Sequence, residues 1–252
     1  MLTLNCDLGE LVGEANNDAL IMPMIDQANI ACGAHAGDTQ SMTNTVKLAI
    51  QHNVIIGAHP SYPDRENFGR KSIIIEKAAL KTSLTAQINA LSKICIEQKT
   101  QLNYVKPHGA LYNDMMKNLP IFQTVCQAVA MANNRLNKKL SLMIQALPNT
   151  QPYQKIANKY NITLLFEAFS DRAYQANGLL VPRSQQGAVI HQQEKVIEQI
   201  TQLIKHQKLT TIDGGFLALH VDSLCVHGDN DVALTLVSSL RKLIKKSNAE
   251  NK

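Results

Sequence analysis

The sequence predicts an α/β protein built as a (β/α)7-type barrel, and three observations support this fold class. Seven short apolar segments alternate with longer helical or polar stretches, as in proteins with a parallel sheet. The length of 252 residues is typical of one such barrel. Charged residues and histidines follow the apolar segments, and barrels carry their functional groups at the carboxyl ends of the strands. We therefore expect a single barrel domain over residues 1–252.

Seven apolar runs are expected to form the strands of the barrel. They are short and are bounded by Gly, Pro, Asn or Asp, which is typical of buried parallel strands. A doubly wound open sheet is the alternative, but it would gather polar residues mainly at one switch point. The expected strands cover residues 2–6, 29–32, 54–56, 102–105, 140–145, 162–166 and 223–226.

The expected helices lie between these strands and show apolar residues at helical spacing. Asp38 is a suitable N-cap for one helix, and Pro120 suits the first turn of another. The dipeptide Asp213-Gly214 favours a tight β-hairpin, which we expect as a small insertion before the last barrel strand. The expected helices cover residues 18–27, 38–50, 76–99, 120–132, 150–160, 192–206 and 231–246.

Composition and charge argue against several kinds of partner and compartment. The formal net charge is only +5, and the densest basic run, at residues 241–246, lacks interleaved aromatics, so no nucleic-acid interface is expected. No apolar run approaches the ~20 residues of a membrane helix. The first residues lack the basic and apolar regions of a signal peptide. Five cysteines without CxxC spacing indicate reduced thiols, and we expect a cytoplasmic protein.

Polar side chains stand at the exits of most expected strands. In a barrel these exits meet on one face, so the side chains are expected to converge on one site. Histidines recur there beside Gly, Ala or Pro, whose small size lets a ligand approach the backbone. The exit residues are Asp7, Glu10, His35, Asp38, His59, Lys106, His108, Asp171, Arg172, His227 and Asp229.

Each of these residues also has a plainer interpretation. Any single histidine could be a structural imidazole, although four at equivalent positions favour a site. Asp7 could be a general base, a metal ligand or a helix N-cap. Lys106 could form a structural salt bridge or bind an anion, and Arg172 and Arg183 could bind a carboxylate or phosphate or pair with local acids.

Cys32 and Cys225 lie close to histidines in the sequence, which raises the question of a thiol nucleophile. A nucleophilic cysteine needs an activating base and partial exposure. Both residues fall inside apolar strand-like runs, so we interpret them as buried hydrophobic side chains.

Six motifs along the whole chain resemble the LamB/YcsF family, whose members are described as the A subunit of the prokaryotic 5-oxoprolinase (ATP-hydrolysing). Small departures are Glu66-Asn67-Phe68, where the family tends to have a glycine before Phe, and Ser170 in place of Ala; neither is a candidate catalytic residue. The motifs are LNCDLGE (4–10), ANIACGAHAGD (28–38), GAHPSYPDRENFGR (57–70), VKPHGALYN (105–113), EAFSDRAYQANGLLVPR (167–183) and CVHGD (225–229).

The resemblance implies a distorted barrel of the glycoside hydrolase/deacetylase type. It also implies hydrolysis of the cyclic amide 5-oxo-L-proline to L-glutamate at the expense of ATP, performed together with B and C subunits. The chain has no GxxxxGK[ST] motif, so it carries no recognisable P-loop. We expect ATP to be a co-substrate, either bound at the barrel mouth or, as we favour, used by the partner subunits.

This reaction needs groups that move protons and groups that bind anions, and the strand exits offer both. The expected catalytic residues are Asp7, His35, His59, Lys106, His108, His227 and Asp229. The expected substrate-binding residues are Glu10, Asp38, Tyr112, Asp171, Arg172 and Arg183. No metal is assigned; if a divalent metal is bound, its expected ligands are Asp7, His35 and His59.

Two alternative functions stay open. One is a metal-dependent, deacetylase-like hydrolase, since relatives of the implied fold use such ligands. The other is a lactam-binding or scaffolding subunit without catalysis of its own. The sequence leaves open whether the chain forms a homo-oligomer and which surface contacts the other subunits.

Overall fold

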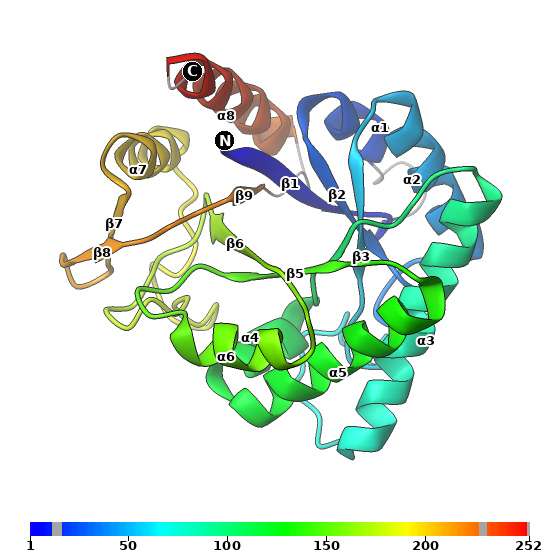
Figure 1. Ribbon diagram of the computed structural model, residues 1–252. Helices are drawn as coiled ribbons and strands as arrows, with labels where there is room; N and C mark the ends of the chain where they lie inside the picture. Colours follow the sequence, from blue (N-terminus) through cyan, green and yellow to red (C-terminus); the bar gives the residue numbers. More distant parts are fainter. Residues whose placement is uncertain (12–16, 227–230, 251–252) are drawn as a thin grey trace.

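A closed parallel barrel forms the centre of the computed structural model, which describes residues 1–11, 17–226 and 231–250. The barrel closes because the first strand pairs in parallel with both the second and the last. This confirms the predicted (β/α)7-type barrel and contradicts the open-sheet alternative (Figure 1). In order around the barrel the strands are β1 (Thr3–Leu8), β2 (Gln27–Ala31), β3 (Ile55–His59), β4 (Tyr104–Val105), β5 (Ser141–Gln145), β6 (Leu164–Phe169) and β9 (Ser223–Val226).

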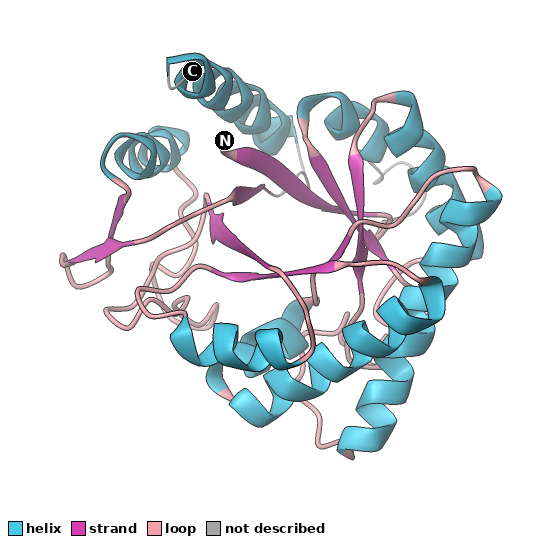
Figure 2. Ribbon diagram, viewed as in Figure 1, coloured by secondary structure: helices cyan, strands magenta, loops and turns pink. Residues whose placement is uncertain are grey.

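Helices surround the barrel, as Figure 2 shows. Asp38 begins one of them in the predicted manner, because its side chain and that of Ser41 form a capping box. Pro120 lies in the first turn of another, whose N-cap is Asn118. The helical segments are α1 (Asp18–Ile21), η2 (Met22–Met24), α2 (Thr39–Gln51), α3 (Lys77–Glu97), α4 (Gly109–Lys117), α5 (Leu119–Leu136), α6 (Gln151–Lys159), α7 (Gln193–His206) and α8 (Asp231–Glu250).

The predicted hairpin is present between α7 and the last barrel strand. Its strands β7 (Lys208–Thr210) and β8 (Phe216–Ala218) pair in antiparallel fashion and lie beside α7, outside the barrel (Figure 1). Among the described helices, none is both long and apolar enough to cross a membrane.

The structure corrects several predicted boundaries. The expected helix 18–27 ends at Met24, since Pro23 interrupts it and β2 already begins at Gln27. Helix α4 begins directly after His108, where the sequence suggested a loop. Strands β1, β3 and β6 continue through Asp7, His59 and Glu167, because neighbouring strands supply ladder partners to these polar residues. Their side chains therefore have the fixed positions of strand residues.

A layer of polar side chains crosses the barrel interior below the site. Asn29 donates to Asn5 Oδ1 at 2.8 Å, Asn5 donates to Ser223 at 2.8 Å, and the Tyr104 hydroxyl donates to Asn29 at 2.6 Å. The Tyr104 ring can lie here only because residue 57 is glycine; a Cβ atom at Gly57 would fall within the ring. Each of these buried polar groups finds a partner, so the layer provides a rigid floor.

Candidate active site

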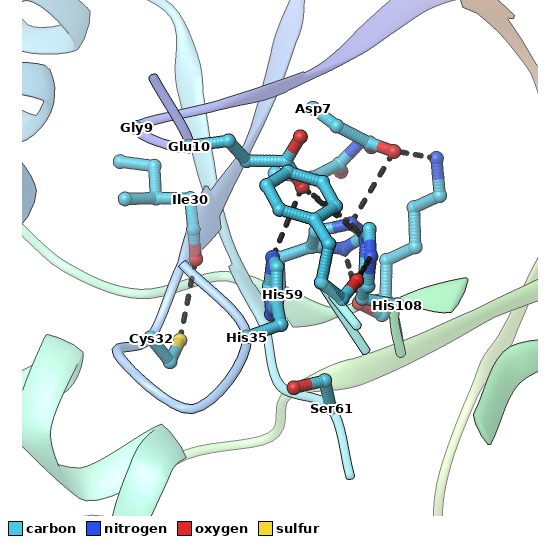
Figure 3. Close-up of polar contacts among 12 residues, drawn as sticks. Asp7, Gly9, Glu10, Ile30, Cys32, His35, His59, Ser61 and His108 are labelled. Atoms are coloured by element: carbon cyan, nitrogen blue, oxygen red, sulfur yellow. Dashed lines mark hydrogen bonds and ion pairs between the residues drawn. The ribbon is translucent and has the colours of Figure 1, made fainter. Parts of the chain in front are cut away.

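The site lies at the carboxyl ends of the barrel strands, and its residues come from most of them. Asp7 belongs to β1, His59 to β3 and Glu167 to β6. Glu10 and His35 lie in the loops after β1 and β2, and Lys106 and His108 connect β4 to α4. Figure 3 shows Asp7, Glu10 and the three histidines converging from these separate segments.

The first part of the site, here called the Lys106 centre, consists of Lys106, Asp7 and Glu167. The Lys106 ammonium lies 2.9 Å from Asp7 Oδ1 and 3.1 Å from Glu167 Oε2. Burial alone would lower the pKa of Lys106, but the negative charges of Asp7 and Glu167 outweigh it and raise the pKa well above its ordinary value. The ammonium is therefore a permanent positive charge at the base of the site.

Asp7 is held from two sides. It accepts a hydrogen bond from Asn29 Nδ2 at 2.7 Å as well as the ion pair from Lys106, both at Oδ1. Its second oxygen lies 3.3 Å from His59 Nε2. The polar layer thus fixes the Asp7 carboxylate between the lysine and the histidines.

The second part, here called the histidine cluster, consists of Glu10, His35, His59 and His108. Glu10 Oε1 lies 3.0 Å from His35 Nε2 and 3.2 Å from His108 Nδ1, and His108 Nδ1 lies 2.9 Å from His59 Nε2. The His35 and His108 rings stack with centroids 3.8 Å apart and planes within 2°. Burial lowers the pKa of His35 to about 4, against a smaller opposing effect of its hydrogen bond to Glu10, so His35 is neutral near pH 7.

Glu10 is ionised in this setting. Burial favours its neutral form, but the polar contacts with His108 and His35 outweigh burial and lower its pKa to about 2. The loop that carries Glu10 is held because the Gly9 backbone N–H donates to the buried Asp18 carboxylate at 2.9 Å. A carboxylate is therefore presented to three imidazoles at a fixed position.

The loop between β3 and α3 covers one side of the histidines. His108 Nε2 contacts the Phe68 carbonyl at 2.9 Å, and the Ala110 N–H donates to the Gly69 carbonyl at 2.9 Å. Residue 109 must be glycine here, because its φ is +58° and a Cβ atom would meet the Gly69 oxygen at 2.5 Å. This contact brings the loop, including Phe68, over His108.

A cavity of about 400 Å³ opens above both parts of the site. This volume suits a small molecule. Phe169 and Tyr112 form apolar walls, and positively charged side chains surround the opening. The lining residues that carry charge or an imidazole are Asp7, Glu10, His59, Arg70, Lys106, His108, Lys117, Arg172 and Arg183.

The structure brings most of the predicted site residues to this cavity, and His35 lies just behind it in the histidine cluster. Among the described residues, neither Asp38 nor Asp171 belongs to the lining. Asp38 is an exposed helix N-cap. The Arg172 guanidinium donates to the carbonyls of Val181 and Ala188 and so holds the loop that carries Arg183. The predicted residues His227 and Asp229 lie outside the described residues.

Three charged residues of the site were not singled out by the sequence. Glu167 lies between apolar residues within β6, and an isolated acid in an apolar strand was the signal that could have identified it. Arg70 lies in the loop between β3 and α3, and Lys117 is the last residue of α4. Their positions at the opening depend on tertiary packing alone.

The fold and the site together define a parallel α/β barrel with a charged cavity at the carboxyl ends of its strands. The chain resembles the crystal structure of the lactam utilization protein from Thermus thermophilus, with a TM-score of 0.86 and 32% identity, covering 98% of this chain and 97% of that one. The LamB/YcsF family model matches residues 2–252, so the chain belongs to the LamB/YcsF family.

Curated relatives extend this similarity over nearly the full length. A protein of Vibrio cholerae serotype O1, named as the A subunit of 5-oxoprolinase, is 46% identical over 242 residues, which are 95% of this chain and 96% of the relative. A protein of the same name from Pseudomonas fluorescens is 44% identical over 250 residues, covering 98% of each chain.

Proposed function

We propose that this chain is the A subunit of an ATP-dependent 5-oxoprolinase and that it opens the lactam ring of 5-oxo-L-proline together with B and C subunits. The observation that carries the proposal is the Lys106 centre, a fixed ammonium paired with Asp7 at the base of a small, cation-rimmed cavity. The names of the curated relatives support the same activity.

The chemistry explains why such a site is useful. A lactam is an unactivated amide, and phosphorylation of its oxygen makes the ring carbon electrophilic. Water then adds to this carbon. The resulting tetrahedral carbon bears the new hydroxyl, the phosphate and the ring nitrogen. Cleavage of the C–N bond with a proton delivered to nitrogen opens the ring to an acyl phosphate, and a second water releases glutamate and phosphate. Loss of phosphate before C–N cleavage would re-form the lactam and waste ATP.

The residues of the cavity suit these steps. Asp7, beside His59, is positioned to accept a proton from the attacking water. Lys106 offers positive charge to the oxyanion that develops on the ring carbon. His108, when its ring carries a second proton, can deliver that proton to the leaving nitrogen, and Arg183 and Arg70 at the opening suit the substrate carboxylate and phosphate.

On this proposal ATP is a co-substrate of the reaction, and the partner subunits bind it. The chain has no P-loop motif, and a cavity of about 400 Å³ suits a lactam phosphate better than a nucleotide. On this proposal the partners phosphorylate the lactam, and this chain receives the activated ring.

The test is glutamate release from 5-oxoproline and ATP, measured for this chain alone and with its partner subunits. We expect glutamate only from the full set. Lys106→Met and His108→Ala, each confirmed as folded by circular dichroism, should abolish release, whereas the exposed His206→Ala should not. Full turnover by both site variants would overturn the catalytic assignment and favour a purely binding role.

A further inference from the structure

We infer that the histidine cluster is a binding site for one divalent transition-metal ion, with Glu10 Oε1, His35 Nε2, His59 Nε2 and His108 Nδ1 as its ligands. One possible ligand atom from each of these four residues lies within 4.8 Å of the others. The inference deepens the proposed function, because it concerns the same cavity, and it can fail while that function holds.

The first argument is the position of hydrogen on two rings. His59 Nδ1 lies 2.7 Å from the Lys106 carbonyl, and His108 Nε2 lies 2.9 Å from the Phe68 carbonyl. A carbonyl oxygen only accepts, so each of these nitrogens carries the N–H. In the uncharged rings the opposite nitrogens, His59 Nε2 and His108 Nδ1, are then bare lone pairs.

These two lone pairs face each other at 2.9 Å. Two acceptors at that distance repel unless positive charge lies between or beside them. Glu10 Oε1, 3.2 Å from His108 Nδ1 and 3.8 Å from His59 Nε2, adds a third electron-rich atom rather than a donor. A cation bound by all of them removes the repulsion.

The second argument is geometric and chemical. Metal–nitrogen bonds of about 2.0–2.1 Å in a tetrahedral site place neighbouring ligand atoms roughly 3.3 Å apart. Four of the six separations among the ligand atoms, at 2.9–3.8 Å, bracket this value, and all six are within 4.8 Å, so binding would draw the more distant ligands closer together. Three imidazoles and one carboxylate favour zinc, iron or similar ions over calcium and magnesium. Metal-binding histidines usually donate their second N–H to a backbone carbonyl or carboxylate, as His59 and His108 do here.

The ligand set differs from the expected set of Asp7, His35 and His59. Asp7 is already bound to Lys106 and Asn29 through Oδ1, and its Oδ2 lies beside the cluster. Glu10 and His108 take its place because the β1 loop and the turn after β4 bring them closer to His35 and His59. Since Glu10, His59 and His108 line the cavity, a bound ion would offer Lewis acidity to the substrate, and His108 would then be a ligand instead of the proton donor.

The experiment measures metal content of the full chain, prepared without a polyhistidine tag, by elemental analysis after incubation with Zn²⁺ and removal of excess. We expect about one ion per chain and a melting temperature raised by Zn²⁺. His108→Asn and His35→Asn, checked by circular dichroism, should each weaken Zn²⁺ binding at least ~100-fold. Asp7→Asn and the surface variant His206→Ala should keep the ion, and Co²⁺ should give the absorption of a four-coordinate site.

Absence of bound zinc and of a melting shift in the wild-type chain would overturn the inference and point to a proton shared between His59 and His108. Unchanged binding in both His108→Asn and His35→Asn would overturn it as well. Loss of the ion in Asp7→Asn would contradict the proposed ligand set. A chain that binds no zinc yet releases glutamate with its partners contradicts only the metal site, and one that binds zinc but releases no glutamate with its partners contradicts only the proposed activity.

Discussion

The Lys106 centre and the histidine cluster lie side by side but differ in the charged groups that they contain. In the Lys106 centre, one ammonium faces the carboxylates of Asp7 and Glu167, so the chain supplies both signs of charge. In the histidine cluster, a carboxylate and three imidazoles crowd together, and none of these four described residues carries a permanent positive charge. The first region contains a cation of its own, whereas the four residues of the second do not, so the second calls for a ligand.

This difference predicts how each region responds to substitution. Removing the cation that faces these two carboxylates leaves their charge uncompensated, so the loss of stability should be largest there. Removing one member of a crowded cluster removes its contacts but also relieves repulsion. We therefore expect activity to fall more than stability.

Lys106→Met should have the largest effect. It leaves Asp7 and Glu167 without their ammonium, and breaking a buried pair in this way costs about 3–5 kcal/mol. Denaturant unfolding followed by circular dichroism measures the loss. The double variant Lys106→Met/Glu167→Gln should recover part of it. Wild-type stability in the single variant would show that the ion pairs of Lys106 do not stabilise the fold.

His108→Asn should lower turnover by about 10²–10⁴-fold, as expected for loss of a proton-transferring group, while the free energy of unfolding falls by only about 1–3 kcal/mol. Glutamate and phosphate release by the full set of subunits provide the measurement. We also expect more phosphate per glutamate, because slower C–N cleavage lets the tetrahedral centre return to lactam. An unchanged ratio at reduced rate would assign His108 a different step.

Gly57→Ala should destabilise the floor that both regions share. The new methyl group would collide with the Tyr104 ring, whose hydroxyl holds Asn29 and through it Asp7. Overpacking of this kind costs about 1–3 kcal/mol. Thermal unfolding measures it, and Gly57→Ala/Tyr104→Leu, which removes the ring, should be less affected by the added methyl. Equal losses in both backgrounds would refute this explanation.

Arg183→Ala should leave both regions intact and weaken substrate binding from the rim. We expect KM for 5-oxoproline to rise about tenfold, equivalent to about 1.4 kcal/mol, with little change in kcat. Arg172→Met is the contrasting variant, because it removes hydrogen bonds to Val181 and Ala188 and should lower stability. Steady-state kinetics and thermal melting separate the two. A fall in kcat without change in KM would move Arg183 to the reacting centre.

Treatment with a thiol reagent should have the smallest effect, because we expect no reaction with the native chain. Cys225 lies 3.2 Å from the Lys106 ammonium, yet burial outweighs that charge and raises its pKa well above the ordinary value; burial raises the pKa of Cys32, beside the histidines, to about 12. Both stay protonated at pH 8. A thiol reagent should label no cysteine of the native chain and all five after unfolding. Rapid labelling of one native thiol would reopen a nucleophilic role.

Much of this architecture could be predicted from the sequence. The apolar runs indicated the number and order of the barrel strands, and Asp213-Gly214 marked the hairpin. Helix α4 was missed although Leu111 and Met115 have helical spacing, since the polar residues before it suggested a loop. Strand ends were placed too early at Asp7, His59 and Glu167, because polar residues continue a strand when a neighbouring strand offers pairing partners.

The sequence by itself determined which residue types stand at the carboxyl ends of the strands, because parallel strands direct these ends to one face. Only the tertiary structure decided which of them touch. His59 meets His108 across 49 residues, and Lys106 meets Cys225 across 119. Such distances depend on the register of strand pairing and on closure of the barrel, which no local pattern encodes. The same closure joined Glu10 to three histidines, left Asp38 as an N-cap, and gave Lys106 the carboxylate of Glu167 as a second partner.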